Sequence, residues 1–355
     1  MNRFHRLRTV CALLLLISVM ALTACTQQPT VKISFAMGST VTAKLYTENQ
    51  DEANEISDII NTALGNTEKA LSNTDKTAEL YKLNESRVMY VSDYLRDTLI
   101  DCLKICNITN RRLDISIGSV TSLWGFNTDT PSLPDSDALE AALETVDISK
   151  IILDPNSNKV TLQSSGAKID LGAFGKGIAC DDIYESIKYY GVPALISVGG
   201  TILAYDENPS GKKWSIGIRN PFENENSFFA RLELSPDYPV NAVYVSTSGS
   251  YEKSFTENET VYHHILDPKT GYPVETDLVS VTVVASSGIA ADALSTALFI
   301  TGLNEDAQYY LELFDCEAVF VFSDKTYFVT EGLKGSIKDV DSQYTLSDFS
   351  FKNEK

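Results

Sequence analysis

Hydrophobic and polar residues alternate along this chain with two different periods. Strict alternation predicts strands over residues 31–35 and 41–46. Apolar positions three and four residues apart predict helices over 52–71 and 92–106, with the polar segment 73–87 between them. Further helices are predicted over 135–146, from the glycine-containing bend at 172–177 to Gly191, and over 289–300 and 305–314. Further strands are predicted over 151–154 and 159–163, which form a hairpin, and over 168–171, 194–198, 214–218, 242–246, 279–284 and 318–322.

These elements are interspersed without a regular β-α-β period, which favours the α+β fold class. Neither an internal repeat nor a long linker divides the chain. Residues 31–350 are therefore predicted to form one folded domain.

The 355 residues include 29 Lys and Arg against 48 Asp and Glu, which gives a formal net charge of −19. Nucleic-acid affinity comes largely from cationic side chains that displace counterions from phosphates. This excess of acid argues against nucleic acid as a partner and against electrostatic adhesion to anionic lipid. Any membrane attachment has to be covalent or helical.

The first residues have the pattern of an export signal. Three arginines precede the apolar run 10–22, which is short for a membrane-spanning helix. The run ends in Leu-Thr-Ala-Cys at residues 22–25, which resembles the lipobox of bacterial lipoproteins. This resemblance predicts a signal peptide at 1–24, a lipid on Cys25, and a tether at 25–30 that anchors the domain outside the cell membrane. The alternative is an ordinary signal peptide with an incidental cysteine.

Four cysteines, at 102, 106, 180 and 316, lie in the predicted domain. Cys102 and Cys106 are one helical turn apart and share a face with leucines and an isoleucine. We therefore expect buried thiols rather than a metal site.

Residues 169–179 run from a predicted strand through a glycine-containing bend into a helix, which can present backbone N–H groups to an anion. The spacing matches neither the Rossmann nor the P-loop fingerprint. Tight packing explains such glycines as well as ligand binding does, but Asp170 and Lys176 in the same bend favour a ligand. A second glycine pair, Gly199-Gly200, is explained on local evidence by a hairpin turn.

Two histidines, His263 and His264, are adjacent in the predicted domain. Neighbours on a strand point to opposite faces, so a His-rich zinc centre is excluded and at most one imidazole faces a given site. Two polar strand residues without a function are the alternative.

Asp292 and Thr296 are one turn apart at the start of a predicted helix and share a face. Their oxygens, with a backbone carbonyl, waters and substrate phosphates, suit Mg²⁺. Capping of the helix by Asp292 is the structural alternative. No G-x-S-x-G elbow is present, which disfavours hydrolysis by a serine triad.

Seven short motifs, taken in order, resemble those of the ApbE family of FAD:protein FMN transferases. They are 36–40 (AMGST), 123–126 (LWGF), 170–177 (DLGAFGKG), 198–200 (VGG), 247–249 (TSG), 264–271 (HILDPKTG) and 292–297 (DALSTA). The resemblance implies an ApbE-type fold with a T-fold-like core. It also implies a Mg²⁺-dependent reaction that splits FAD, joins FMN through its phosphate to a Thr or Ser hydroxyl of an exported flavoprotein, and releases AMP.

By position, the resemblance also implies the roles of individual residues. Mg²⁺ would be held by Asp292, Thr296 and the backbone carbonyl of Ala173. His264 would lie near the reacting phosphate or the acceptor hydroxyl. The FAD site would be lined by Met37, Trp124, Gly125, Phe126, Asp170, Lys176 and Ile265. Acceptors of the family are subunits of sodium-translocating NADH:quinone reductases, Rnf-type complexes and extracytoplasmic flavin reductases.

One departure from the family pattern keeps a second activity open. Family members often carry Ser-Thr-Tyr where this chain has Leu71-Ser72-Asn73-Thr74, so Thr74 takes the place of the tyrosine. Some members hydrolyse FAD to FMN and AMP, and a Mg²⁺-dependent FAD pyrophosphatase is the first alternative. A flavin-binding or solute-binding lipoprotein without enzymatic activity is the second.

Overall fold

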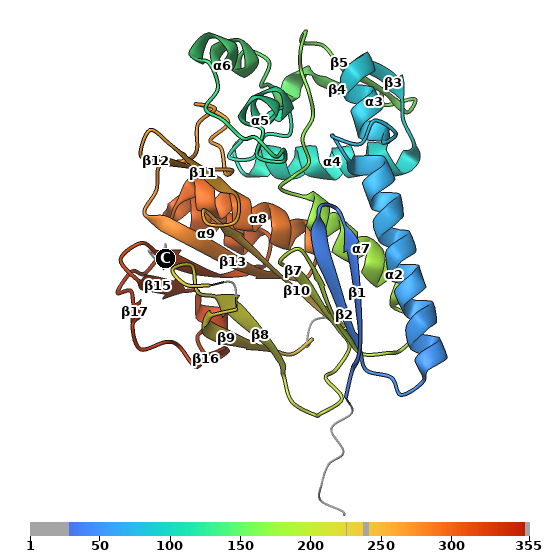
Figure 1. Cartoon of the computed structure of the whole chain (residues 1–355), viewed down its shortest axis with the longest axis vertical. Coiled ribbons are helices and arrows are strands. Elements are labelled where there is room, and N and C mark those ends of the chain that lie inside the picture. Colours follow the sequence, from blue (N-terminus) through green and yellow to red (C-terminus); the bar gives the residue numbers. More distant parts are fainter. Residues whose placement is uncertain (1–27, 225, 237–240, 352–355) are drawn as a thin grey trace, which may run out of the picture.

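The computed structural model describes residues 28–224, 226–236 and 241–351. Its centre is a nine-stranded mixed sheet in which the neighbouring pairs are antiparallel except β15–β17 (Figure 1). In spatial order its strands are β1 (Thr30–Ala36), β2 (Ser39–Leu45), β6 (Ala194–Val198), β7 (Thr201–Tyr205), β10 (Ala242–Gly249), β13 (Leu278–Ala285), β14 (Glu317–Phe322), β15 (Thr326–Val329) and β17 (Thr345–Leu346).

Helices cover one face of this sheet and a small sheet covers part of the other. The covering helices are α2 (Gln50–Leu71), α7 (Gly175–Ile187), α8 (Gly288–Thr301) and α9 (Glu305–Leu313). The small sheet consists of β8 (Trp214–Arg219), β9 (Phe228–Leu234) and β16 (Ile337–Lys338). The main hydrophobic core lies between the sheet and the helices, and a second core lies under β8 and β9.

The rest of the described chain forms a part of the molecule beyond the end of the large sheet (Figure 1). Its elements are α3 (Glu79–Ser86), α4 (Asp93–Ile108), α5 (Gly118–Trp124), α6 (Ser136–Leu143), the sheet of β3 (Val88–Tyr90), β5 (Lys159–Leu162) and β4 (Ile151–Leu153), and the hairpin of β11 (Ser254–Glu257) and β12 (Thr260–His263). Two short 3₁₀ turns, Ile148–Lys150 and Glu331–Leu333, complete the described elements.

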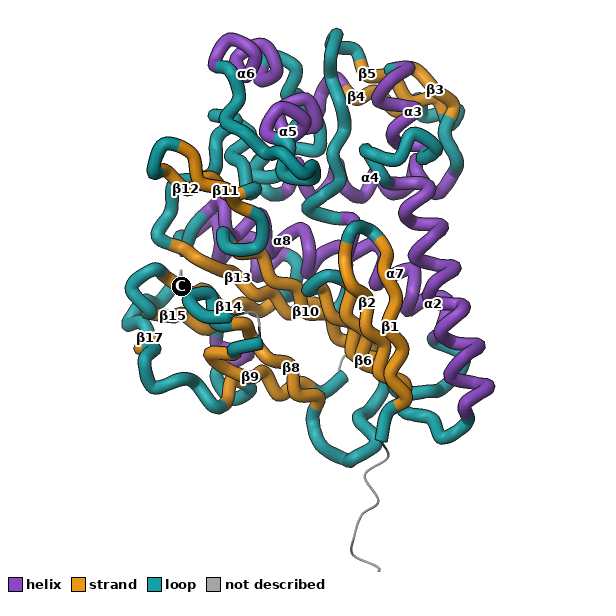
Figure 2. The backbone as a smooth tube through the Cα atoms, viewed as in Figure 1, coloured by secondary structure: helices purple, strands orange, loops and turns teal. Residues whose placement is uncertain are grey.

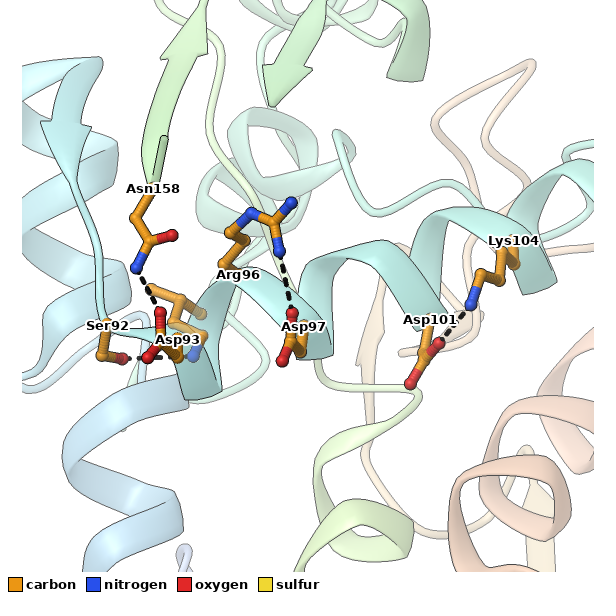
Figure 3. Close-up of polar contacts among 8 residues, drawn as sticks. Ser92, Asp93, Arg96, Asp97, Asp101, Lys104 and Asn158 are labelled. Carbon is orange, nitrogen blue, oxygen red and sulfur yellow. Dashed lines mark hydrogen bonds and ion pairs between the residues drawn. The ribbon is translucent and has the colours of Figure 1, made fainter. Parts of the chain in front are cut away.

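Local chemistry fixes where several of these elements begin. The Asn49 side chain accepts hydrogen bonds from the backbone N–H groups of Asp51 and Glu52 and so caps α2. Helix α4 is capped by Ser92, and its surface carries the ion pairs Arg96–Asp97 and Asp101–Lys104 (Figure 3).

The turn between β1 and β2 consists of two residues with positive φ, Met37 at 52° and Gly38 at 67°. This is the type I′ geometry, whose twist matches that of a two-stranded hairpin. It places Met37 and Gly38 at the tip of the hairpin.

The α+β prediction is confirmed, and most predicted elements lie within a few residues of the observed ones. The segment 73–87 was predicted to be polar connection, but it contains α3, because Leu80 and Leu83 are buried in the main core. The predicted strand 168–171 is wrong: its residues form only an isolated bridge between Lys168 and Ile117. The predicted hairpin of 151–154 with 159–163 and the turn at Gly199-Gly200 are both confirmed.

The four cysteines of the described residues are unpaired and buried, as expected. In the same part of the chain, none of the helices combines the length and the apolar character needed to cross a lipid bilayer. Cys25 and the predicted signal peptide lie outside the described residues.

Candidate active site

A cavity of about 680 Å³ opens between the end of the large sheet and the part of the molecule that contains α5. This volume falls in the range of small-molecule and cofactor sites. Its walls come from the β1–β2 turn, the end of α2, the bend before α7, the end of β10, the segment after β12, and α8. Segments far apart in the sequence therefore build one site.

The bend before α7 and the first turn of that helix each present a charged side chain at the cavity. The Asp170 carboxylate accepts hydrogen bonds from the backbone N–H of Gly172 at 2.7 Å and from the Thr121 hydroxyl at 2.6 Å. The Lys176 ammonium donates to the carbonyl of Gly199 at 3.3 Å. The bend thus joins α5 to the β6–β7 turn and holds Lys176 at the cavity wall.

Helices α7 and α8 cross with their backbones in contact. A Cβ atom on Gly177 would lie 2.1 Å from the carbonyl oxygen of Gly288, and one on Gly288 would lie 2.2 Å from that of Gly177. Only glycine permits this approach. Packing therefore explains Gly177, and the same packing brings the first turn of α7 against Asp292 of α8.

Asp292 is buried, with 3% of its surface exposed, and its carboxylate accepts three hydrogen bonds. The donors are the backbone N–H of Gly177 at 2.9 Å, the Ser246 hydroxyl at 3.0 Å and the Thr201 hydroxyl at 3.3 Å. Asp292 does not cap α8: the Ser287 hydroxyl accepts from Ala290, and the Asp181 carboxylate accepts from the N–H groups of Gly288 and Ile289. The capping alternative is therefore wrong.

Thr296 lies one turn after Asp292 and also lines the cavity. Its hydroxyl is 2.9 Å from that of Ser248, which in turn is 2.8 Å from the Ser295 hydroxyl. Ala173, whose carbonyl was predicted as a ligand, lines the same cavity. Within the described ranges, no cluster of three or more His, Cys, Asp or Glu side chains has a metal-binding arrangement. Any metal here would take mostly neutral oxygen ligands from the protein.

Two lysines, Lys176 and Lys253, and one histidine, His264, line the same cavity. Burial and the charge of Lys176 lower the pKa of the Lys253 ammonium, which donates to Asn127 at 2.7 Å. Burial, with the charges of Lys253 and Lys176, lowers the pKa of His264 to about 4. The imidazole is therefore neutral at pH 7, and its buried Nδ1 has no hydrogen-bond partner among the described residues. Of the two histidines, only His264 lines the cavity, whereas His263 bonds the carbonyl of Val274.

Nine of the eleven predicted FAD, metal and catalytic residues line the cavity: Met37, Phe126, Asp170, Ala173, Lys176, His264, Ile265, Asp292 and Thr296. The other two, Trp124 and Gly125, are not on the described wall. Trp124 is fully buried, stacks on Phe126 with ring centroids 5.6 Å apart, and donates from its indole N–H to Gly271 at 2.7 Å. Trp124 supports the wall from behind, and Gly125 ends α5 with a φ of 66°.

Charged wall residues that were not predicted from the sequence are Glu68, Arg112, Asp114, Asp129, Glu252 and Lys253. Two of them, Lys253 and Asp114, have perturbed pKa values. Lys253 follows the Thr-Ser-Gly motif by four residues, so the motif marks its neighbourhood but not the residue. Asp114 is buried and accepts hydrogen bonds from the backbone N–H and the hydroxyl of Ser116. Burial raises the pKa of the Asp114 carboxyl. Neither Lys253 nor Asp114 belongs to a sequence motif that indicates a binding or catalytic role, so only the folded structure shows that they line the cavity.

Hard oxygen donors, two lysines and a neutral histidine around a cavity of this size define a site for a phosphorylated, nucleotide-like ligand. The comparison with known proteins agrees with this class. Residues 37–320 match the model of the ApbE family, and the chain belongs to that family.

Curated relatives carry the name FAD:protein FMN transferase. One from Klebsiella pneumoniae is 27% identical over 319 residues, which cover 88% of this chain and 95% of that protein. One from Haemophilus influenzae is 30% identical and covers 80% of this chain and 84% of that protein. Among solved structures, the ApbE protein of Thermotoga maritima has a TM-score of 0.78 at 24% identity, over 87% of this chain and 99% of that one. The flavin transferase ApbE of Vibrio cholerae has a TM-score of 0.74 at 23% identity, with the same coverage. The fold is therefore that of ApbE proteins.

Proposed function

We propose that this chain is a Mg²⁺-dependent FAD:protein FMN transferase. The acceptor hydroxyl oxygen of a Thr or Ser bonds to the phosphorus of the FMN half of FAD. The bond from that phosphorus to the bridging oxygen breaks, AMP leaves, and the hydroxyl proton is released. The observation that carries the proposal is one cavity, in a member of this family, that brings together Asp292 and Thr296, two lysines and His264.

The donor set of α8 fits Mg²⁺. A carboxylate has about four acceptor sites, and Asp292 uses three of them within the protein. About one site is left for a cation, and the Thr296 hydroxyl and the Ala173 carbonyl would supply further oxygen ligands from the same cavity wall. This set supplies one negative charge, so the pyrophosphate of FAD would complete the coordination, as is usual for Mg²⁺. The ion would neutralise charge on the reacting phosphate and its leaving group.

Lys176 and Lys253 supply local positive charge for an anionic cofactor, on a wall that also carries Arg112 and six carboxylates. Phosphoryl transfer depends mainly on positioning and on neutralisation of charge. Lys176 and Lys253 place two positive charges at the cavity, and each lowers the pKa of His264, so both fields reach that side chain. We infer that they hold the phosphates while Asp170 and Phe126 contact the rest of FAD.

His264 is proposed to accept the proton of the acceptor hydroxyl or to orient that hydroxyl. His264 lines the cavity, and its neutral imidazole has a buried Nδ1 without a hydrogen-bond partner among the described residues. Because its pKa lies near 4 in the free protein, its protonation state does not change between about pH 6 and pH 8. We expect His264→Asn to slow FMN transfer by about 10²-fold, with a ratio of wild-type to variant rates that stays constant over this pH range. A ratio that falls severalfold toward pH 6 would contradict the neutral role.

The reaction itself is tested with the domain, FAD, Mg²⁺ and an exported flavoprotein from the same cell. Intact mass of the acceptor and assay of free FMN and AMP distinguish the candidates. An FMN-sized mass increase with one AMP released per transfer supports the transferase. Free FMN without a modified acceptor supports the pyrophosphatase, which the position of Thr74 on the cavity wall keeps open. Bound FAD without either product supports a flavin-binding protein.

We propose that the protein acts outside the cell membrane, anchored by a lipid on Cys25. The proposal rests on the signal-like residues 1–24 and the lipobox-like end of that run. The acceptors are then exported flavoproteins, such as subunits of NADH:quinone reductases and Rnf-type complexes or extracytoplasmic flavin reductases. Mass spectrometry of the N-terminal peptide of the native protein decides between a lipidated Cys25 and an ordinary cleavage product.

A further inference from the structure

Strand β1 is an edge of the large sheet that carries an exposed apolar stripe. Val31, Ile33 and Phe35 are 49%, 72% and 74% exposed. The alternate residues face the helix layer, where the Lys32 ammonium donates to Asn54 of α2 at 2.6 Å. Edge strands are usually protected by outward lysines, prolines or bulges, and the exposed face of β1 has none of these.

The hairpin geometry identifies which backbone groups of β1 are free. In a two-residue hairpin the residues that flank the turn, here Ala36 and Ser39, form a hydrogen-bonded pair, and such pairs alternate with non-bonded ones. Val31, Ile33 and Phe35 therefore direct their N–H and C=O groups away from β2. Within the described chain, no backbone hydrogen bond from another segment reaches these three residues. The same residues thus offer both an apolar surface and an unpaired strand edge.

This edge leads into the active site. Strand β1 continues directly into Met37, Gly38 and Ser39, which line the cavity. Figure 2 shows β1 at the outer side of the sheet, with its turn directed toward the part of the molecule that contains α4 and α5. The opposite edge strand, β17, has two residues and lies at the other end of the sheet order. Of the two edges, β1 is the one with the length and the position to guide a chain to the cavity.

We propose that an extended segment of the acceptor protein pairs with the free edge of β1 as an added strand, which delivers its Thr or Ser hydroxyl to the cavity. This inference rests on the proposed transfer of FMN to another protein. Seven residues of strand span about 23 Å, so a paired segment reaches the cavity mouth in extended form. Backbone pairing supplies affinity, and contacts with the exposed side chains of Ile33 and Phe35 supply selectivity. Three side chains make a small contact compared with the roughly 1,200–2,000 Å² of stable complexes, which suits a substrate that must leave.

The variants distinguish loss of acceptor binding at the β1 edge from loss of folding and from loss of catalysis. Ile33→Pro removes the outward N–H without removing a bond to β2, because proline is tolerated on edge strands where its nitrogen faces solvent. The double variant Ile33→Lys/Phe35→Lys keeps the backbone and removes the apolar stripe. Ile33→Val retains both features. Tyr189→Lys is the matched surface control, since Tyr189 is 87% exposed beyond the far end of α7.

The probe is an extracytoplasmic flavin reductase domain, incubated first with the wild-type enzyme to establish transfer and to map the modified threonine. We expect Ile33→Pro and the double variant to raise the KM for this domain about tenfold or more, with FAD affinity and kcat at saturating acceptor within about twofold. Ile33→Val and Tyr189→Lys should match the wild type. If Ile33→Pro does not fold, the KM of the Ile33→Lys/Phe35→Lys variant for the acceptor tests the proposal. Unchanged KM in the double variant would overturn the proposal, as would a change confined to the oligomeric state, which would assign the edge to a second copy of this chain. Absence of transfer by the wild type would instead reject the proposed function.

Discussion

Asp292→Asn is expected to leave a folded protein that transfers FMN about 10²–10³-fold more slowly than the wild type. Asparagine can accept from Gly177 with its oxygen and donate to the Ser246 or Thr201 hydroxyl, because a hydroxyl also accepts. The hydrogen bonds therefore survive, while the single negative charge of the proposed Mg²⁺ site is lost. The measurement is the initial rate of acceptor modification over a Mg²⁺ titration, with the melting temperature recorded on the same samples.

Thr296, one helical turn after Asp292, supplies the control variants for this result. Thr296→Ser keeps the hydroxyl and should retain most of the rate, whereas Thr296→Val removes it and should weaken the response to Mg²⁺. Asp292→Ala is a poorer test, because it would leave three buried donors without an acceptor, at about 1–3 kcal/mol each. A rate for Asp292→Asn within about threefold of the wild type would show that Asp292 does not contribute to the proposed metal site.

The second large effect is on stability: Gly177→Ala should lower the free energy of unfolding by about 3 kcal/mol or more. The added Cβ would lie 2.1 Å from the Gly288 carbonyl oxygen and 2.7 Å from the Asp292 Cβ. Both are rigid parts of α8, so the two helices have to separate. The separation would also break the hydrogen bond from Gly177 to Asp292, and FAD binding should weaken together with stability. Denaturant unfolding and FAD titration of one preparation measure both effects.

Gly65→Ala is the matched control, because it makes the same substitution within a helix. Gly65 lies inside α2, and no atom is within 4 Å of the position its Cβ would take. Alanine there should raise the free energy of unfolding by about 0.5–1 kcal/mol, through its better helix propensity. Equal effects of the two substitutions would show that the crossing of α7 and α8 is looser than the backbone contact indicates.

The sequence predicted long periodic elements well and short or buried ones poorly. Helix α2 was predicted within two residues at its start, because both its apolar period and its end are clear. Helix α3 was missed because its eight residues carry only two large core side chains among polar ones. Residues 168–171 have the apolar pattern of a strand, but the backbone of Gly118 packs against Lys168, so only one bridge forms.

Site residues were also predicted well where the pattern is local in the sequence and poorly where distant contacts decide their position. The glycine-containing bend identified Asp170 and Lys176, and the one-turn spacing of a carboxylate and a hydroxyl identified Asp292 and Thr296, since these patterns are local in the sequence. Which face a side chain takes is not local: Trp124 and Phe126 look alike in sequence, yet only Phe126 reaches the cavity. Lys253 hydrogen-bonds Asn127, which is distant in the sequence, whereas the Asp114 carboxylate hydrogen-bonds the nearby Ser116; the fold places both residues on the cavity wall.

The cavity wall begins at Met37 and extends to Ile300, so most of the chain has to be in place before the ligand site exists. A ligand of such a site binds the native state and not the unfolded chain. FAD at 100 times its dissociation constant would then raise the free energy of unfolding by about 2.7 kcal/mol. A chain that ends before α8 lacks Asp292, Thr296 and part of the wall, and should gain no such protection. If the chain is exported as proposed, the supply of FAD outside the cell membrane would therefore influence how much of the enzyme survives proteolysis, as well as how fast it works.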